Sequence, residues 1–124
     1  MNIVDSSGWL EYFAGGANAS YFEPAITKLS ELLVPSVSLY EVFKRVYQQR
    51  GEGEALVAVA LMQQGTVVDL DSTLAMSSAK ISAEMKLPMA DSIMLATARQ
   101  AGAVLWTQDT DFEGMQGVRY VKAR

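Results

Sequence analysis

Carboxylates are the side chains of this sequence best suited to chemistry. The chain has 124 residues with 14 Asp and Glu and ten Lys and Arg, but it contains no histidine and no cysteine. This composition excludes histidine-ligated zinc, Ser-His triads, histidine general bases, thiol nucleophiles and disulfides. Any reaction that the chain carries out must therefore use carboxylates, hydroxyls, amides or the Lys and Arg side chains.

Three aspartates occupy related places along the chain. Asp5 comes directly after a short apolar run at residues 2–4, and Asp109 comes just after the apolar run that ends at Trp106. Asp91 falls in the first turn of a helix that begins at Pro88. Ligands of open α/β sheets collect outside the carboxyl ends of the strands. We therefore expect Asp5 and Asp109 at one edge of the molecule.

Each of these acids also has a purely structural interpretation. Asp5 could be a helix N-cap or a turn residue, and Asp91 could complement the positive end of its helix. The helix around Asp91 is apolar almost all round. An unpaired carboxylate there would cost on the order of several kcal/mol unless a cation compensates it. For Asp91 a metal or charge partner is therefore the favoured interpretation.

Two further acids are harder to assign. Ser38 and Glu41 form a capping-box pattern, and Glu41 lies opposite the apolar stripe of its helix, so the pattern alone predicts a helix cap in contact with water. Asp109 and Asp111 share one polar turn, where at least one of them should serve turn structure. Spacing does not decide between these two aspartates.

The elements that must position these acids alternate between short strands and helices. Strands are predicted at residues 2–4, 33–35, 66–68, 103–106 and 117–121. Helices are predicted from a cap at Ser6 or Ser7 to Gly15-Gly16, from Glu23-Pro24 to about Leu32, from a cap at Ser36 or Ser38 to Gly51, and over residues 52–64, 71–85 and 88–101. This alternation predicts an α/β fold with a parallel sheet and helices on both faces.

Length and composition predict one domain over residues 1–124 in a reducing cytoplasm. The amino terminus lacks the basic region of a signal peptide, and the longest strongly apolar stretch, residues 55–62, is too short to span a bilayer. A net charge of −4 argues against a basic platform that holds nucleic acid by phosphate contacts alone. Bound metal ions would invert that local field.

Four segments carry a family resemblance. They are VDSSGWL at residues 4–10, SVSLYEV at residues 36–42, LPMADSIMLATA at residues 87–98 and LWTQDTDF at residues 105–112. Together they resemble the PIN domain family, as found in the VapC toxins of bacterial and archaeal toxin–antitoxin pairs. The sequence departs from the family pattern at Ser92, where a small apolar residue is commoner, and in having both Asp109 and Asp111. Neither departure removes a carboxylate, but the second leaves the ligand set open.

The resemblance implies a three-layer α/β/α fold around a mostly parallel sheet of about five strands. It also implies an acidic pocket that binds Mg²⁺ or Mn²⁺ through Asp5, Glu41, Asp91 and Asp109. Asp111 would contribute through water or as a supporting ligand. Thr107 and Ser6 would orient carboxylates by hydrogen bonds, although Thr107 could equally be a turn hydroxyl at a strand end.

The activity implied by the resemblance is hydrolysis of RNA phosphodiester bonds by the toxin of a toxin–antitoxin pair. Such toxins usually form homodimers and bind a small antitoxin. Lys44 and Arg45, one turn beyond Glu41, are candidate contacts for substrate phosphates, or simply a solvated helix face. The alternative function is a non-catalytic PIN-like module that binds protein or RNA. Surplus apolar residues between positions 36 and 64, among them Val57 and Met62, fit either an interface or a two-sided core contact.

Overall fold

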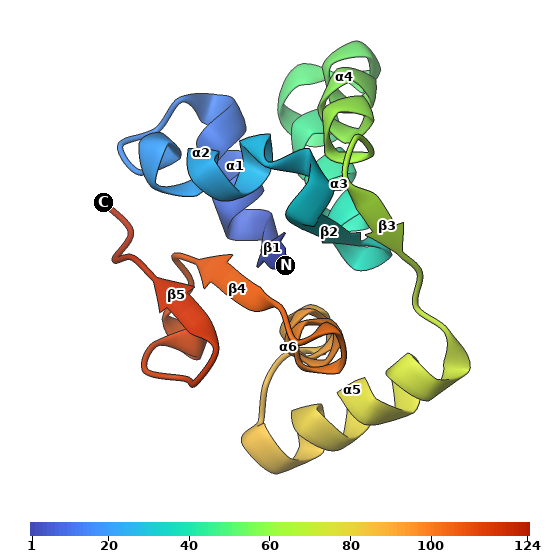
Figure 1. Ribbon diagram of the computed structural model, residues 1–124. Coiled ribbons are helices and arrows are strands. Elements are labelled where there is room, and N and C mark those ends of the chain that lie inside the picture. The colour runs from blue at the N-terminus through green and yellow to red at the C-terminus, as the bar shows by residue number, and fades with distance from the viewer.

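A five-stranded parallel sheet forms the middle layer of the molecule (Figure 1). The computed structural model describes residues 1–124. In spatial order the strands are β3 (Thr66–Val68), β2 (Leu32–Pro35), β1 (Asn2–Val4), β4 (Val104–Thr107) and β5 (Val118–Tyr120). All neighbouring strands pair in parallel. The predicted α/β class and the number and direction of the strands are confirmed.

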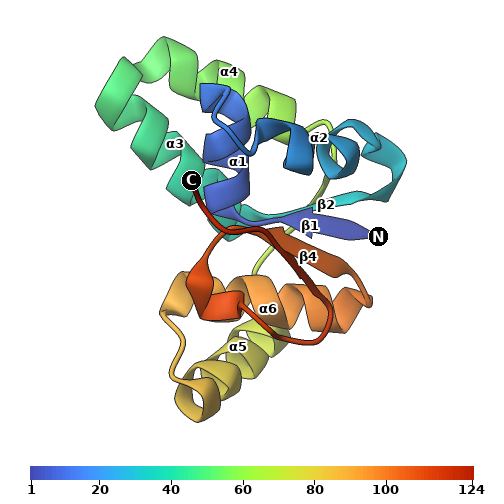
Figure 2. The same cartoon turned by 90° about the vertical axis from the view of Figure 1, so that its left-hand side faces the viewer.

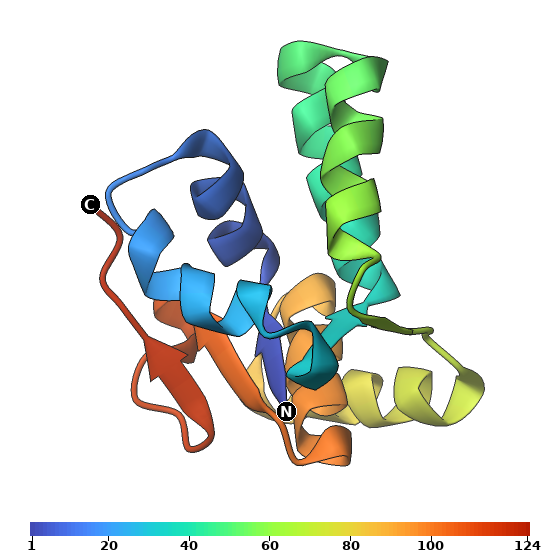
Figure 3. The ribbon, with the colours of Figure 1, turned by 45° about the horizontal axis from the view of Figure 1, so that its top comes forward.

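Helices cover both faces of this sheet (Figure 2). One face carries α1 (Ser6–Ala14), α2 (Ala19–Thr27), α3 (Ser36–Arg50) and α4 (Glu52–Met62), and the other carries α5 (Ser72–Met85) and α6 (Met89–Ala101). Two short 3-10 helices, η1 (Leu29–Glu31) and η2 (Thr110–Phe112), complete the fold. The hairpin of α3 and α4 extends away from the sheet (Figure 3). None of the helices has both the length and the apolar character needed to cross a bilayer.

Each face of the sheet has its own hydrophobic core. Trp9, Phe22 and Val42 are buried between the sheet and helices α1 to α4. Met94 and Leu95 of α6 are buried on the opposite face. Of the surplus apolar residues predicted in the α3–α4 hairpin, Met62 is fully buried, whereas Val57 is 62% exposed. The hairpin therefore both fills the core and leaves apolar side chains in water.

The second helix differs from its predicted extent. It covers residues 19–27 instead of about 23–32, and Pro24 lies inside it. Burial of Phe22 and Ile26 against the core stabilises the helix on both sides of the proline, although the missing N–H leaves one helical hydrogen bond unmade. A proline that was predicted to begin the helix therefore lies in its second turn.

Two predicted helix caps are also wrong. Asp5 caps α1, because its side chain accepts a hydrogen bond from the N–H of Gly8, and neither Ser6 nor Ser7 does so. Helix α3 starts at Ser36 without a side-chain cap. Ser38 is consequently inside the first turn and fully buried, with its hydroxyl 3.5 Å from the sulfur of Met94. The capping box of Ser38 and Glu41 is not formed.

Replacing Gly8 by alanine should destabilise the fold. A Cβ at Gly8 would lie 2.6 Å from Cγ1 of Val4 and 2.8 Å from Cε1 of Phe22, so α1 would have to move away from β1 and α2. We expect Gly8→Ala to lower the free energy of unfolding by about 1–3 kcal/mol in urea denaturation. Gly53→Ala is the matched control, because a Cβ there meets nothing within 4 Å. Equal effects of the two substitutions would contradict this packing.

Candidate active site

The acidic residues gather at the carboxyl edge of β1 and β4. These strands are neighbours, with Val4 paired to Trp106, and the N–H of Asp5 donates to the carbonyl of Trp106 across them at 3.1 Å. Asp5 follows β1 and Asp109 follows β4 within two residues of its end. The expectation that Asp5 and Asp109 share one edge of the sheet is confirmed.

Asp5 is a buried carboxylate held by three hydrogen bonds. Its Oδ1 accepts from the hydroxyl of Ser7 at 2.7 Å and from the N–H of Gly8 at 2.9 Å. Its Oδ2 accepts from the hydroxyl of Thr107 at 2.6 Å. The residue is only 3% exposed. A carboxylate has about four lone-pair positions, so Oδ2 keeps one position free for another ligand.

A second group of acids lies on the neighbouring elements. Carboxylate oxygens of Asp91, Asp109 and Asp111 lie within 4.8 Å of one another. Asp91 is in the first turn of α6, and the seven residues after it, 92–98, are all buried. Asp109 caps η2 by accepting from the N–H of Asp111 at 2.9 Å. The structure therefore brings both Asp109 and Asp111 to Asp91, and the choice between them as a ligand stays open.

Thr107 links the two sets of carboxylates. Its hydroxyl donates to Asp5 and accepts from the N–H of Asp109 at 2.8 Å. Because Thr107 is fully buried, this hydroxyl has no competing water. It orients the Asp5 carboxylate and holds the start of the turn that carries Asp109.

Burial and mutual repulsion raise the pKa of two of these acids. Burial is the main cause that raises the pKa of Asp5 to about 6, and its hydrogen bonds from Thr107, Ser7 and Gly8 oppose that rise. Burial also raises the pKa of Asp91 to about 7, followed by the charge of Asp109 and a hydrogen bond with Asp111. Neither of the two ion pairs in the molecule involves these acids. The site is thus an excess of negative charge without a cation.

Glu41 lies apart from that group. It is half-buried on α3, and its Oε1 accepts from the hydroxyl of Ser6 at 2.6 Å. The prediction that it faces water holds only in part: Glu41 lines an open groove, but β2 pairs with β1 and so brings α3 beside α1, which half-buries it. Glu41 is not among the carboxylates that lie within 4.8 Å of one another. It reaches the site through Ser6, the neighbour of Asp5.

Two basic residues line the approach to Glu41. Lys44 and Arg45 are exposed and border a groove of about 400 Å³ that also contains Ser6 and Glu41. Neither forms an ion pair within the chain. Both cations are therefore available beside the acidic site.

Asn18 and Gln108 were not predicted from sequence patterns. Asn18 is buried, and its amide bonds Gln108, which lies between Thr107 and Asp109. These two residues are 90 positions apart. Asn18 also follows a run of glycine and alanine that suggests only a turn. The contact depends on the folded chain and has no local signal.

A family model for the PIN domain matches residues 3–118. The chain belongs to the PIN domain family. Proteins with this domain are generally nucleases. No curated protein matches the chain in sequence.

Solved toxin structures share the fold of this PIN domain. A toxin–antitoxin complex from Klebsiella pneumoniae matches with a TM-score of 0.80 at 22% identity, with 96% of each chain covered. The VapC20 toxin of Mycobacterium tuberculosis, which cleaves the sarcin–ricin loop, matches with a TM-score of 0.74 at 19% identity, over 96% of this chain and 99% of that one. DNA-bound VapBC from Salmonella typhimurium matches with a TM-score of 0.72 at 18% identity, over 98% and 96% of the two chains.

The raised pKa values predict how stability depends on pH in the metal-free protein. Aspartates of the unfolded state titrate near pH 4. Between about pH 4 and pH 7 the folded state therefore keeps protons on Asp5 and Asp91 that the unfolded state has released. The free energy of unfolding should therefore fall as pH rises from about 4 to about 7. Asp91→Asn removes the larger of the two shifts, so this variant should melt at a higher temperature than wild type at about pH 8 in EDTA.

The difference in melting temperature between wild type and Asp91→Asn should shrink toward about pH 4, where both folded proteins carry a neutral group at position 91. Thermal melts across this pH range measure it. Glu23→Gln, an exposed change on α2, controls for the loss of one negative charge. Parallel melting curves for wild type and Asp91→Asn at every pH would contradict the assigned environment of Asp91.

Proposed function

We propose that this PIN domain, spanning residues 1–124, is a divalent-metal-dependent endoribonuclease and the toxin of a toxin–antitoxin pair. The observation that carries the proposal is a group of acids in which Asp5 is buried and Asp91 and Asp109 are half-buried, and none of which forms an ion pair. Isolated buried charge is costly, and a chain that needed these acids only for stability would be more stable with neutral residues there. A bound cation accounts for them.

The donor set fits Mg²⁺ or Mn²⁺. These hard cations prefer oxygen ligands, and the site offers carboxylates without histidine or cysteine. Asp5 and Asp91 are the proposed direct ligands, with Glu41 and Asp109 as further ligands or as groups that position water. Asp111 is a supporting or alternative ligand. When bound, divalent metal lowers the pKa of water and stabilises a leaving oxygen.

The chain's own residues would hold the reacting groups in place. Thr107 and Ser6 fix the orientation of Asp5 and Glu41 through hydrogen bonds of 2.6 Å each. Lys44 and Arg45, which border the groove beside Glu41, would bind phosphates of the RNA strand as charge-assisted donors. The carboxylates repel one another and would also repel the scissile phosphate. The phosphate would therefore approach them only when bound metal neutralises their charge.

The proposed partners are a small antitoxin and a second copy of the chain. The structural relatives support the first, because they include toxin–antitoxin complexes from Klebsiella pneumoniae and Salmonella typhimurium. Apolar side chains exposed on the α3–α4 hairpin support a protein interface of either kind. They are Tyr40, Tyr47, Leu56, Val57 and Leu61, each more than two-fifths exposed.

Metal should stabilise the folded protein. A ligand that binds only the folded state at a concentration of a hundred times its Kd adds about 2.7 kcal/mol to the free energy of unfolding. We therefore expect Mn²⁺ or Mg²⁺ to raise the melting temperature of wild type and to leave Asp91→Asn nearly unchanged. Glu23→Gln should respond as wild type does. If millimolar metal leaves the melting temperature of wild type unchanged, the proposed metal site is refuted.

RNA cleavage tests the activity itself. With Mn²⁺, wild type should cut total RNA and leave 5′ phosphates, and Asp5→Asn should lower the rate by about a hundredfold or more, since it removes charge from the reacting centre. Thr107→Val should cost roughly 10- to 100-fold, because it frees the Asp5 carboxylate from its orienting hydroxyl. If metal stabilises the protein but RNA stays intact, the domain is a non-catalytic binding module instead.

A further inference from the structure

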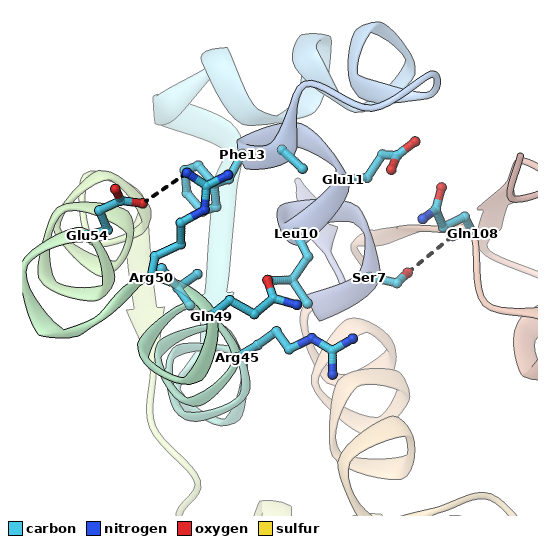
Figure 4. Close-up of a pocket in the computed structure, with 11 residues that line it drawn as sticks. Ser7, Leu10, Glu11, Phe13, Arg45, Gln49, Arg50, Glu54 and Gln108 are labelled. Atoms are coloured by element: carbon cyan, nitrogen blue, oxygen red, sulfur yellow. Dashed lines mark hydrogen bonds and ion pairs between the residues drawn. The ribbon is translucent and has the colours of Figure 1, made fainter.

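A cleft of about 500 Å³ opens between α1, α3 and Gln108 (Figure 4). Its volume falls in the range of sites for small ligands, roughly 300–1,000 Å³. Leu10 and Phe13 of α1 and Val46 of α3 give it apolar walls. Ser7, whose hydroxyl donates to Asp5, also lines the cleft. The cleft thus begins beside the carboxylate site.

Gln108 presents a hydrogen-bond donor to this cleft. Asn18 Nδ2 lies 3.0 Å from the main-chain carbonyl of Lys122, so this atom must be the amide nitrogen and a donor. The same nitrogen lies 3.0 Å from Oε1 of Gln108, which must therefore be the acceptor oxygen. The Nε2 of Gln108 is left without a partner in the chain, and in Figure 4 it lies on the cleft side of the amide.

The charged residues of the cleft leave one cation free. Arg50 pairs with Glu54 at 3.8 Å, and Glu11 accepts from the N–H of Asn18 at 2.8 Å. Arg45 has no such partner, and its guanidinium extends from α3 toward the side on which Ser7 and Gln108 lie (Figure 4). This unpaired cation stands where a strand of phosphates would enter the cleft.

The cleft adjoins the groove at Glu41. Leu10 and Arg45 line both hollows. A single strand that passes Glu41 and Arg45 would therefore carry its next base into the cleft. Gln49 of α3, with a second side-chain amide, lines the same cleft.

We propose that this cleft binds one nucleobase beside the scissile phosphate of single-stranded RNA, and that Gln108 selects that base. The proposal rests on the proposed nuclease function. We place position 6 of a purine or position 4 of a pyrimidine against the fixed donor of Gln108, where guanine and uracil present a keto oxygen and adenine and cytosine present an amine. Arg45 binds the phosphate between the two hollows. The cleft is thus a specificity pocket for G or U.

The test maps the cut ends of total RNA after digestion with Mn²⁺. Wild type should show G or U enriched at one position beside the cut. Gln108→Glu keeps the acceptor that Asn18 requires but turns the cleft-facing donor into an acceptor, so the enrichment should move to A or C. Gln108→Met removes the donor without adding charge, and it should abolish the preference at that position while lowering cleavage of the preferred sites about tenfold or more.

Gln63→Glu is the matched control, because Gln63 is exposed at the C-terminal end of α4 and does not line the cleft. It should cut as wild type does. Melting temperatures with and without Mn²⁺ confirm that each variant folds and binds metal.

Two results would overturn the proposal, and they differ. If both Gln108 variants cut with the base preference of wild type, Gln108 does not select a base and the specificity pocket is refuted, while the nuclease function stands. If wild type itself leaves RNA intact in Mn²⁺, the nuclease function fails and the specificity pocket fails with it.

Discussion

The burial of one carboxylate, that of Asp5, connects the fold to the site. Asp5 follows β1, caps α1 by accepting a hydrogen bond from the N–H of Gly8, and accepts another from the hydroxyl of Thr107 on the neighbouring strand β4. With the bond from Ser7, the carboxylate accepts three hydrogen bonds from the protein while almost no water reaches it. They do not supply a counter-charge. The fold therefore holds a negative group at the edge of its sheet, and the acids of α6 and η2 add to it.

The topology of the sheet explains why the other acids join Asp5. From β1 the chain moves to β2 and β3 on one side, and it returns through α5 and α6 to β4 on the other side. Ligand sites of open α/β sheets form where the strand order reverses in this way. The first turn of α6 carries Asp91 to that point, and residues 92–98, buried all round, anchor it. The packing of these buried residues stabilises α6 even though its first turn holds Asp91 beside other negative charges.

Sequence patterns predicted the strands, most of the helices and the position of Asp5 and Asp109 at one edge of the sheet, because these depend on local apolar runs and on one rule for parallel sheets. Features that depend on distant partners were predicted less well. Glu41 was expected in water because its helix pattern contains no trace of Ser6, which is 35 residues away. The cap of α1 predicted at Ser6 or Ser7 was wrong, whereas the alternative interpretation of Asp5 as a helix N-cap is confirmed by its hydrogen bond from the N–H of Gly8. The contact of Asn18 with Gln108 was missed for the same physical reason as the contact of Glu41 with Ser6, since both join residues far apart in the chain.

The site and the groove beside it differ in what they offer a substrate. The carboxylates demand a cation, whereas the surface of α3 offers unpaired cations at Lys44 and Arg45 and amides deeper in the cleft. Under the proposed function, an anionic strand would approach the cations while metal neutralises the acids. A chain of net charge −4 would then need no broad basic surface to bind RNA.

Anomalous diffraction from crystals grown with Mn²⁺ tests the metal site most directly. We expect an anomalous peak in contact with the carboxylates of Asp5 and Asp91, and its loss in crystals of Asp91→Asn grown under the same conditions. Wild-type crystals at saturating Mn²⁺ that show the carboxylates ordered as described and no peak among them would contradict the proposed metal site.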